Sequence, residues 1–522
     1  MSYFSGKVLL GDLDDFIAPA QACSTGLFSN APQGGGKTQL VMEDDFDEQF
    51  GSNKADVIKS SATKVASVSL ADCLACSGCV TSAETVLIQQ QSTETFLQQM
   101  KQRERSVYVA IVSRPSCVSI ADRLGTSIRD AYLRIQSLLQ SYGVDLVLQQ
   151  EIGEYIALVE SIYEYECRKE GSTTLDDLVT NPSYAVNSDI AVYPAEGQVV
   201  DVNHLDPSIP FVQNQDYFKN PNTVPKVAPN APFITSNCPG WICYAEKKSH
   251  ALVPFLSTVR SAQQIMGQLI RKFLPNQCSS LQSKDIYIVT VVSCYDRKLE
   301  ASRRDFLSPE GSQDIDCVLT SQEIYDLLLK PLPEPVPMRS IQLNIDWWNQ
   351  LKISSCNDVL SSSGGVLLAL LHHILSQHPE AVIQKRTVRN SDFIEVDVCE
   401  GDVTIFKGAF IYGFRNIQNL VMKMRRRKCF YDAVEVMACP SGCLNGGGQI
   451  RPEKKEEMMT IADTLSSMYR NEGGEFDLQE IIQNMQTIYD NLGITIGSEE
   501  AYRLFHTRYH VIPEVTVNSL NW

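Results

Sequence analysis

Residues 437–449, with the sequence MACPSGCLNGGGQ, constrain the fold of this chain more than any other segment. Cys439 and Cys443 are four residues apart, so on a helical turn their two thiols would point in the same direction. Three consecutive glycines follow, and glycine lets a backbone approach a bulky object that side chains would exclude. Two thiol ligands beside a bare backbone indicate a metal cluster whose other ligands come from elsewhere in the chain.

Length and charge limit the classes of protein to consider. A chain of 522 residues predicts two or more packed units. A net charge of −17 argues against nucleic acid as a partner and repels anionic membranes. No apolar run approaches the roughly 20 residues that span a bilayer, and the N-terminus lacks the layout of a signal peptide. We therefore expect a cytosolic protein, with the nucleus as a second location, and neither nucleic-acid nor membrane binding.

The hydrophobic pattern is that of an α/β protein. Strands are expected at 107–112, 144–148, 286–292, 316–319, 393–398 and 403–412. Helices are expected at 119–142, 258–273, 320–329, 366–375, 453–469 and 477–492, and a Thr-x-x-Glu capping box opens the third of them. We expect three regions: an N-terminal region (1–105) with a cysteine-rich site and a flexible linker, a large domain of two α/β lobes (106–450), and a helical C-terminal segment (451–522).

The chain contains sixteen cysteines, which disulfides do not explain in a compartment that keeps thiols reduced. Free cysteine is among the most buried residue types, so cysteines without ligand-like neighbours are interpreted as structural. These are Cys117, Cys167, Cys243, Cys278, Cys317, Cys356, Cys399 and Cys429.

A first constellation of ligands is Cys73, Cys76 and Cys79, with Cys23 fifty residues earlier. The spacing C-x₂-C-x₂-C places three thiolates around one face of an iron–sulfur cubane, and a remote cysteine completes the site. We favour Cys23 as this fourth ligand, although spacing alone does not exclude Cys117 or Cys167. The alternative is a four-cysteine zinc site, which more often uses two separated C-x₂-C pairs.

A second constellation draws on three separate segments. Cys238 lies in TSNCPGW at 235–241, and Cys294 directly follows the strand expected at 286–292. Together with Cys439 and Cys443 they supply the four thiolates that a cubane needs. Loops at strand ends are where α/β folds build their sites. Any one of these cysteines alone would be interpreted as structural.

These segments resemble a known family. TSNCPGW, SCYDRKLEA and MACPSGCLNGGGQ resemble the three signature segments of the catalytic domain of iron-only hydrogenases, and 314–320 and 363–366 resemble its lesser landmarks. Within that superfamily the chain most resembles the eukaryotic cytosolic iron–sulfur assembly factors, which are also called prelamin A recognition factor-like or Nar-type proteins. The shared features are the N-terminal cysteine site and CPGWxxYAEK at 238–247.

The resemblance implies a two-lobed, iron-only hydrogenase-like α/β fold with an N-terminal iron–sulfur extension and a helical C-terminal segment. It also implies two [4Fe–4S] clusters. Cys23, Cys73, Cys76 and Cys79 would bind the first cluster, and Cys238, Cys294, Cys439 and Cys443 would bind the second cluster between the lobes. The implied function is non-catalytic: the protein would link the early cluster scaffold to the late targeting complex that matures cytosolic and nuclear iron–sulfur proteins.

Three departures from the hydrogenase pattern bear on activity. A proton-relaying cysteine precedes the ligand in hydrogenases, but here that position is Asn237, and an amide is no acid near neutral pH. Residues 292–293 are Val-Ser in place of Met-Pro, and Arg297 replaces a lysine. We therefore expect the cluster to remain, with no catalytic residue and no hydrogen chemistry. The alternatives are a hydrogenase-like redox or electron-transfer protein and an interaction protein that binds zinc.

Two further features concern partners. Leu520, Asn521 and Trp522 resemble the tail with which iron–sulfur clients and adaptors engage the targeting complex, although Asn521 departs from the usual middle residue. The alternative is a tail that folds back and packs against the protein. The basic run at 425–428 is interpreted as a solvated cap at a helix end, where cations complement the helix dipole.

Overall fold

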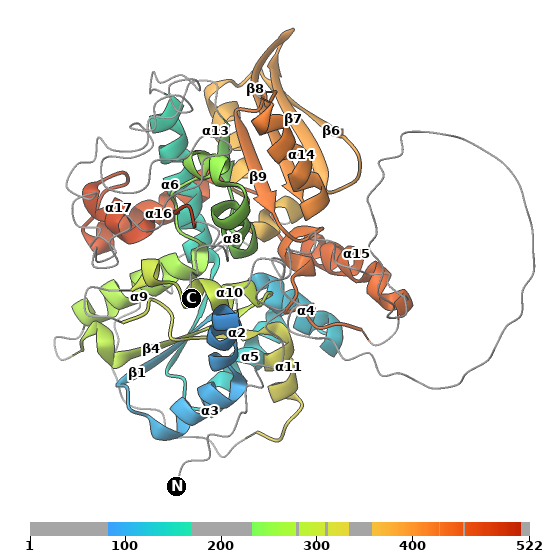
Figure 1. Cartoon of the computed structure of the whole chain (residues 1–522). Helices are drawn as coiled ribbons and strands as arrows, with labels where there is room; N and C mark the ends of the chain where they lie inside the picture. The colour runs from blue at the N-terminus through green and yellow to red at the C-terminus, as the bar shows by residue number, and fades with distance from the viewer. Residues whose placement is uncertain are drawn as a thin grey trace, which may run out of the picture.

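The computed structural model describes residues 82–169, 232–277, 281–307, 312–332, 358–426, 428–452 and 455–512. These residues form two lobes, each built on one β-sheet, with helices between and around the sheets (Figure 1). In the described part of the chain, no helix is long and apolar enough to cross a membrane.

The lower lobe in Figure 1 contains a four-stranded parallel sheet, here sheet A. Its order is β2-β1-β4-β5, formed by β1 (Val107–Val112), β2 (Leu146–Gln149), β4 (Ile286–Val292) and β5 (Cys317–Thr320). Alternate residues of β1 belong to different hydrophobic cores on the two faces of the sheet. This alternation explains why β1 is a continuous apolar run, since a parallel strand is covered on both sides.

The upper lobe contains a five-stranded mixed sheet, here sheet B. Its order is β3-β9-β8-β7-β6, formed by β3 (Phe233–Thr235), β9 (Ala433–Met437), β8 (Val403–Tyr412), β7 (Phe393–Glu400) and β6 (Val382–Thr387). The pairs β3–β9 and β9–β8 are parallel, whereas β8–β7 and β7–β6 are antiparallel. Strand β6 is therefore an exposed edge of the sheet.

Helices form three layers around the two sheets (Figure 1). One core joins the outer face of sheet A to α4 (Arg114–Leu124), α5 (Ile128–Ser141) and α11 (Ser321–Leu328). A central core between the sheets includes α6 (Glu151–Lys169), α9 (Ala262–Gln277), α13 (Val366–Gln377), α16 (Leu478–Leu492) and α17 (Glu499–Phe505). A third core joins the outer face of sheet B to α8 (Pro239–Lys248) and α14 (Phe414–Arg425).

The remaining helices are short or lie at the edges of the lobes. The α-helices are α2 (Ser82–Gln90), α3 (Thr93–Gln102), α10 (Asp296–Ala301) and α15 (Lys455–Asn471). The 3₁₀ helices are η7 (His250–Phe255), η8 (Ser283–Asp285), η9 (Arg304–Phe306), η10 (Val359–Ser363) and η11 (Gly442–Asn445).

Several sequence-based predictions of elements are confirmed. Strands β1, β4 and β8 have the predicted bounds, and β7 and β8 form the predicted hairpin. The capping box of α11 is present: the Thr320 hydroxyl accepts the Glu323 N–H, and the Glu323 carboxylate accepts the Thr320 N–H at 2.8 Å. Helices α13, α15 and α16 lie within two residues of the predicted bounds.

Other predictions of elements are wrong. The single helix predicted at 119–142 is two helices, because Gly125 takes a left-handed conformation (φ 62°) that ends α4, and the Ser127 hydroxyl then caps α5. Helix α9 begins at Ala262 and not at 258. Strands β3, β6 and β9 were not predicted from the sequence.

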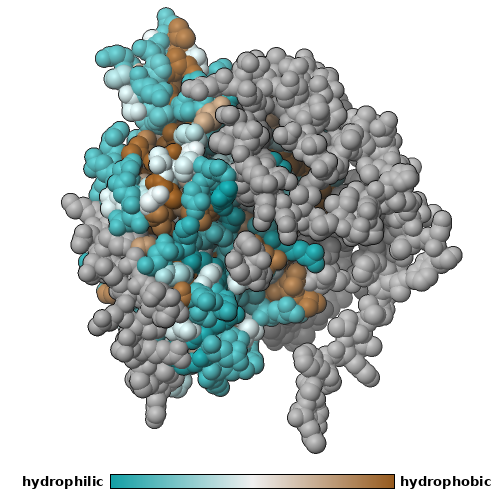
Figure 2. Space-filling view, turned by 90° about the vertical axis from the view of Figure 1, so that its left-hand side faces the viewer, coloured by the Kyte–Doolittle hydropathy of each residue, from teal (hydrophilic) through white to brown (hydrophobic). Residues whose placement is uncertain are grey.

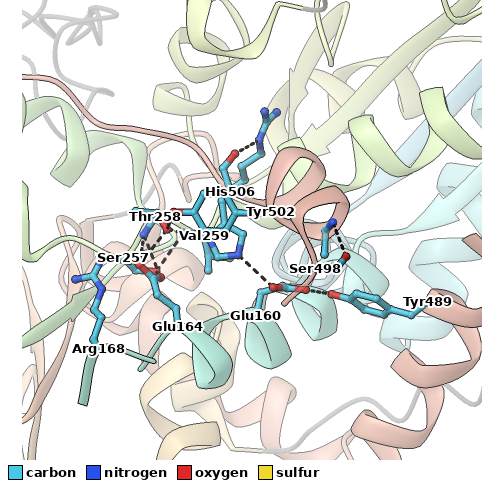
Figure 3. Close-up of polar contacts among 12 residues, drawn as sticks. Glu160, Glu164, Arg168, Ser257, Thr258, Val259, Tyr489, Ser498, Tyr502 and His506 are labelled. Carbon is cyan, nitrogen blue, oxygen red and sulfur yellow. Dashed lines mark hydrogen bonds and ion pairs between the residues drawn. The ribbon is translucent and has the colours of Figure 1, made fainter. Parts of the chain in front are cut away.

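A buried polar network holds the C-terminal helices to α6 (Figure 3). The Glu160 carboxylate accepts the Tyr489 hydroxyl and lies 3.1 Å from Nε2 of His506. Nδ1 of His506 lies 2.8 Å from the Thr258 hydroxyl, and Thr258 donates its N–H and its hydroxyl to the Glu164 carboxylate. These hydrogen bonds hold Thr258 outside α9, which explains the later start of that helix.

Hydrophilic and hydrophobic residues share the face of the molecule shown in Figure 2. The hydrophobic residues gather mainly in the upper half of this view, where hydrophilic residues surround them. Most of the large apolar side chains of the described chain lie in the three cores, which leaves few of them exposed.

Candidate metal centre

Three strand ends bring four cysteines together between the lobes. Cys238 follows β3 and Cys294 follows β4, while Cys439 and Cys443 follow β9. Each of the four thiols lies within electrostatic range of at least two of the others. Strands β3 and β9 are parallel neighbours in sheet B, and β4 belongs to sheet A. The cysteines therefore lie at the carboxyl ends of strands of both sheets, the usual position of sites in α/β folds.

Burial controls the protonation of these thiols. It raises the pKa of Cys238 to about 12, and the neighbouring Asp296 and Cys443 act in the same direction. Burial also raises the pKa values of Cys294 and Cys439 well above the ordinary value, and it raises that of Cys443. Buried thiols that resist ionisation become thiolates when metal cations replace their protons. The chemistry of this donor set therefore fits a cationic iron–sulfur group.

Hydrogen bonds at the end of β3 fix the position of Cys238. Its N–H donates to the Ser236 hydroxyl at 3.1 Å, and that hydroxyl donates to the Val436 carbonyl of β9. Cys238 is the N-cap of α8, and Pro239 begins the helix. Trp241 is fully buried in the core under sheet B and anchors the first turn.

The loop that carries Cys439 and Cys443 is not the helical turn that the sequence analysis assumed. Ser441 (φ 58°) and Gly442 (φ 67°) are both left-handed, and a 3₁₀ helix begins only at Gly442. The Cys443 N–H donates to the Ser363 hydroxyl at 2.9 Å, and a Cβ atom at position 442 would collide with that hydroxyl. The thiols are therefore oriented by two left-handed residues and by contacts with η10.

The glycine run approaches the protein's own backbone. A Cβ atom at Gly446 would collide with the Ser293 carbonyl oxygen, and one at Gly448 would lie 3.2 Å from Cα of Cys294. The Gly448 N–H donates to the Ser293 carbonyl at 2.9 Å. The interpretation that these glycines approach a bulky object is thus corrected for Gly446 and Gly448: they bring the segment of Cys443 against the segment of Cys294.

Arg297 connects two of the cysteine-bearing segments. Its guanidinium donates to the backbone carbonyl of Asn237 at 2.5 Å, to Oδ1 of Asn237 at 2.9 Å and to Glu300 at 2.8 Å. Burial alone would lower the pKa of Arg297, but Glu300 and the thiols of Cys294 and Cys443 raise it, so the guanidinium stays charged. One buried cation thus lies beside two of the thiols.

Sequence reasoning missed several residues around the thiols. Ser363 belongs to a segment that the sequence identified as a landmark. The sequence did not show that the Ser363 hydroxyl accepts the Cys443 N–H. Glu300 is three residues after Arg297, a helical spacing that could have signalled the ion pair. Glu154 raises the pKa of Cys443, and Asp296 raises that of Cys439, but no sequence signal pointed to either contact.

The arrangement of donors differs from that of a single-ion site. Within the described ranges, no three His, Cys, Asp or Glu side chains are arranged to hold one metal ion. Thiolates around one zinc ion would lie about 3.8 Å apart, given a Zn–S bond of about 2.3 Å. A cubane distributes its four thiolates over four irons and so separates them more widely.

Comparison with known proteins places the chain in a family. The family described as "Iron only hydrogenase large subunit, C-terminal domain" matches residues 212–447. Cytosolic iron-sulfur assembly component 3 of Rattus norvegicus is 34% identical over 546 residues and covers 100% of both chains. Protein NAR1 of Arabidopsis thaliana is 33% identical over 539 residues and covers 99% of both. The chain belongs to the family of these assembly proteins.

Solved structures show the fold of this family member. An [FeFe]-hydrogenase, HydA(deltaEFG), has a TM-score of 0.54 at 19% identity and covers 80% of this chain and 98% of the hydrogenase chain. A second [FeFe]-hydrogenase structure has a TM-score of 0.55 at 18% identity, with the same coverage. The predicted two-lobed hydrogenase-like α/β fold is thus confirmed.

Two predicted sites of this assembly-family chain lie outside the described residues. These are the first constellation (Cys23, Cys73, Cys76 and Cys79) and the tail (Leu520, Asn521 and Trp522). Helix α2 begins at Ser82, three residues after Cys79. The Gln91 side chain, just beyond α2, donates to the Lys298 carbonyl of α10 at 2.7 Å. The chain that follows the first constellation is therefore bound to the helix that follows Cys294.

The structure also tests the cysteines interpreted as structural. Cys117, Cys243, Cys317 and Cys399 are buried, which confirms that interpretation for four of them. Cys167 and Cys429 are partly buried. Cys278 and Cys356 lie outside the described residues.

Proposed function

We propose that this chain is a non-catalytic component of cytosolic iron–sulfur protein assembly. In this role it connects the early cluster scaffold to the late targeting complex, with the cytosol as its location and the nucleus as a second one. The names of full-length relatives support assembly over a redox enzyme. One structural observation carries the proposal: four partly buried cysteines converge at strand ends in a hydrogenase-like fold, beside an amide where hydrogenases have a proton-relaying cysteine.

The four cysteines Cys238, Cys294, Cys439 and Cys443 would bind one [4Fe–4S] cluster. Cys23, Cys73, Cys76 and Cys79 would bind a second one by their spacing. A bound cluster supplies one-electron redox chemistry or transferable iron and sulfide. The residues of the chain supply burial, the thiol donors and the orienting hydrogen bonds of Ser236 and Ser363.

The pair of Asn237 and Arg297 supports the absence of hydrogen chemistry. The Asn237 amide oxygen already accepts the Arg297 guanidinium at 2.9 Å, and the amide has no proton to relay near neutral pH. Arg297 is in turn held by Glu300 at 2.8 Å. Asn237 occupies the position of the proton-relaying cysteine of hydrogenases. It is therefore fixed by its hydrogen bond with Arg297, and it is not an acid.

The tail formed by Leu520, Asn521 and Trp522 would bind the targeting complex. The chain that precedes it is firmly attached: the Ile512 N–H donates to the Glu246 carbonyl at 2.8 Å, and His510 lies 2.8 Å from Asp305. Trp522 is ten residues beyond Ile512, a length of chain that can span at most about 35 Å. From this attachment point, Trp522 could contact the targeting complex without any movement of the lobes.

Quantification of iron and sulfide tests the proposed clusters. We expect about eight irons and about eight sulfides per chain after anaerobic purification, and a loss of about four irons in each of Cys73→Ala and Cys443→Ala. Zinc without acid-labile sulfide would contradict the proposal. Loss of all iron from one variant would mean that the two groups of ligands are assigned wrongly or fold as one unit. Infrared bands of bound carbonyl and cyanide would reveal hydrogenase-type chemistry instead.

A further inference from the structure

A basic patch lies on the outer surface of sheet B and at the end of α14. It consists of Arg386, Lys407, Lys423, Arg425, Arg426 and Lys428, all of them exposed or partly exposed. The side chain of Arg386 is 74% exposed and that of Lys423 is 38% exposed. Such a concentration of cations is unexpected in a chain with a net charge of −17.

Contacts around Glu395 show that two parts of the patch are neighbours. The Glu395 carboxylate binds the guanidinium of Arg386 from β6 and lies 3.6 Å from Nζ of Lys423 on α14. Lys423 also donates to the Tyr431 hydroxyl at 2.6 Å, and Tyr431 donates to Glu395. Two cations thus share one carboxylate, so this part of the surface keeps a positive charge.

Backbone contacts join the rest of the patch to the same surface. The Lys428 N–H donates to the Lys423 carbonyl at 2.8 Å, which turns the chain back over the end of α14. Asp432 exchanges two hydrogen bonds of 2.7 Å with the backbone of Lys407 on β8. The exposed Arg425 and Arg426 end α14 and lie between Lys423 and Lys428 in the sequence. Helix end, strand and sheet edge therefore form one basic surface.

Apolar side chains accompany the cations. Phe430 is 75% exposed, two residues after Lys428, and Met422 is 46% exposed on α14. Aromatic residues, Met and Arg are the residue types enriched in protein–protein interfaces. A solvated helix cap accounts for charges at the end of α14, but it accounts neither for Arg386 on the edge strand nor for the exposed Phe430.

We propose that this basic patch binds an acidic protein surface that offers an apolar pocket for Phe430. Charge complementarity favours an acidic partner, because opposite potentials steer encounter and fix register. The carboxylates of Glu395, Asp397 and Asp432 interrupt the cations, so separated acidic side chains match the patch better than a continuous row of phosphates.

Peptide binding to the full-length, cluster-loaded protein tests this proposal. Two labelled peptides of about 20 residues serve as probes: poly-glutamate, and the same peptide with leucine at every fourth position. We expect both peptides to bind at low salt and to weaken as salt increases. Arg425→Glu with Arg426→Glu should weaken both about tenfold, whereas Phe430→Ala should weaken only the leucine-containing peptide.

A matched control variant distinguishes the effect of the patch on peptide binding from the effect of the net charge of the protein. Arg129 and Arg134 are exposed on α5, and changing both to Glu alters the net charge by the same amount as the double change at 425 and 426. This control should bind the peptides as the wild type does, and all variants should keep their iron content. Equal weakening by the control, absence of peptide binding at low salt, or tighter binding of duplex DNA or of phosphatidylserine vesicles would each overturn the proposal.

Discussion

At Arg297, one guanidinium satisfies acceptors from two segments of the chain. It binds the carbonyl and the amide oxygen of Asn237 after β3, and the carboxylate of Glu300 on its own helix. Because Arg297 is buried, its removal would leave the Glu300 carboxylate with only the neutral donors Ser261 and Gln263 and with no positive counter-charge from this position. The guanidinium also lies beside the thiols of Cys294 and Cys443, whose negative charge it stabilises once they are ionised. Arg297 therefore links folding to the electrostatics of the proposed cluster.

Replacement of Arg297 by Gln should have two effects. The unfolding free energy should fall by about 3–5 kcal/mol, because Glu300 becomes a buried, unpaired charge. The reduction potential of the proposed cluster should also fall, because a nearby cation that favours the reduced state is lost. Chemical unfolding and a redox titration followed by electron paramagnetic resonance measure the two effects. Arg297→Lys should restore part of the potential, and an unchanged potential in Arg297→Gln would contradict this role.

At the scale of elements, helix α6 organises the contact between the lobes and the C-terminal helices. Its residues Glu160 and Glu164 bind groups from α16, α17 and the segment before α9 (Figure 3). Burial alone would raise the pKa of Glu164, but Arg168, His506 and hydrogen bonds from Ser257 and Thr258 lower it below the ordinary value. The ionised carboxylate therefore stabilises the folded state.

Stability should depend on pH through Glu164. A lowered folded pKa means that the contribution is fully present above the unfolded pKa, near 4.5, and is lost as pH falls through the folded value. Glu164→Gln should therefore cost about 3–5 kcal/mol at pH 7, and the deficit should shrink below about pH 4.5. Urea unfolding at pH 7 and pH 4 measures the deficit, with the exposed Glu104→Gln as control. A deficit that does not change with pH would contradict this account.

At the scale of the whole molecule, the segment after Cys443 joins the two lobes. Gln449 donates to the Pro115 carbonyl at 2.9 Å and accepts the Ser321 hydroxyl at 2.6 Å, and both partners belong to the lobe of sheet A. The proposed cluster site thus depends on both sheets. The chain before the tail is held at Ile512 by the Glu246 carbonyl of α8.

Deletion of Trp522 should abolish capture of the targeting complex and leave iron content unchanged, because an aromatic end group is the expected anchor of the tail. Pull-down with purified targeting complex, together with iron quantification, measures both quantities. Trp522→Phe should retain part of the capture because it keeps an aromatic ring. Full capture by the deleted chain would mean that the tail does not bind this partner.

The sequence by itself determined the local features: strands β1, β4 and β8, the capping box at Thr320, and the cysteines whose types and positions suit a cubane. These follow from side-chain periodicity and covalent spacing, which are properties of neighbouring residues. Spacing could not show that Gly446 and Gly448 pack against the segment of Cys294. Nor could it place the edge-strand Arg386 beside the end of α14.

Only the tertiary structure decided these relations, because the packing of two sheets determines which distant segments meet. The four cysteines are separated by up to about 200 residues, yet they converge because three strands end between the lobes. The same packing buries Arg297, which donates to Asn237. It also leaves the basic patch exposed on a protein of negative net charge. Residue types thus set what chemistry is possible, and the arrangement of the sheets set where it occurs.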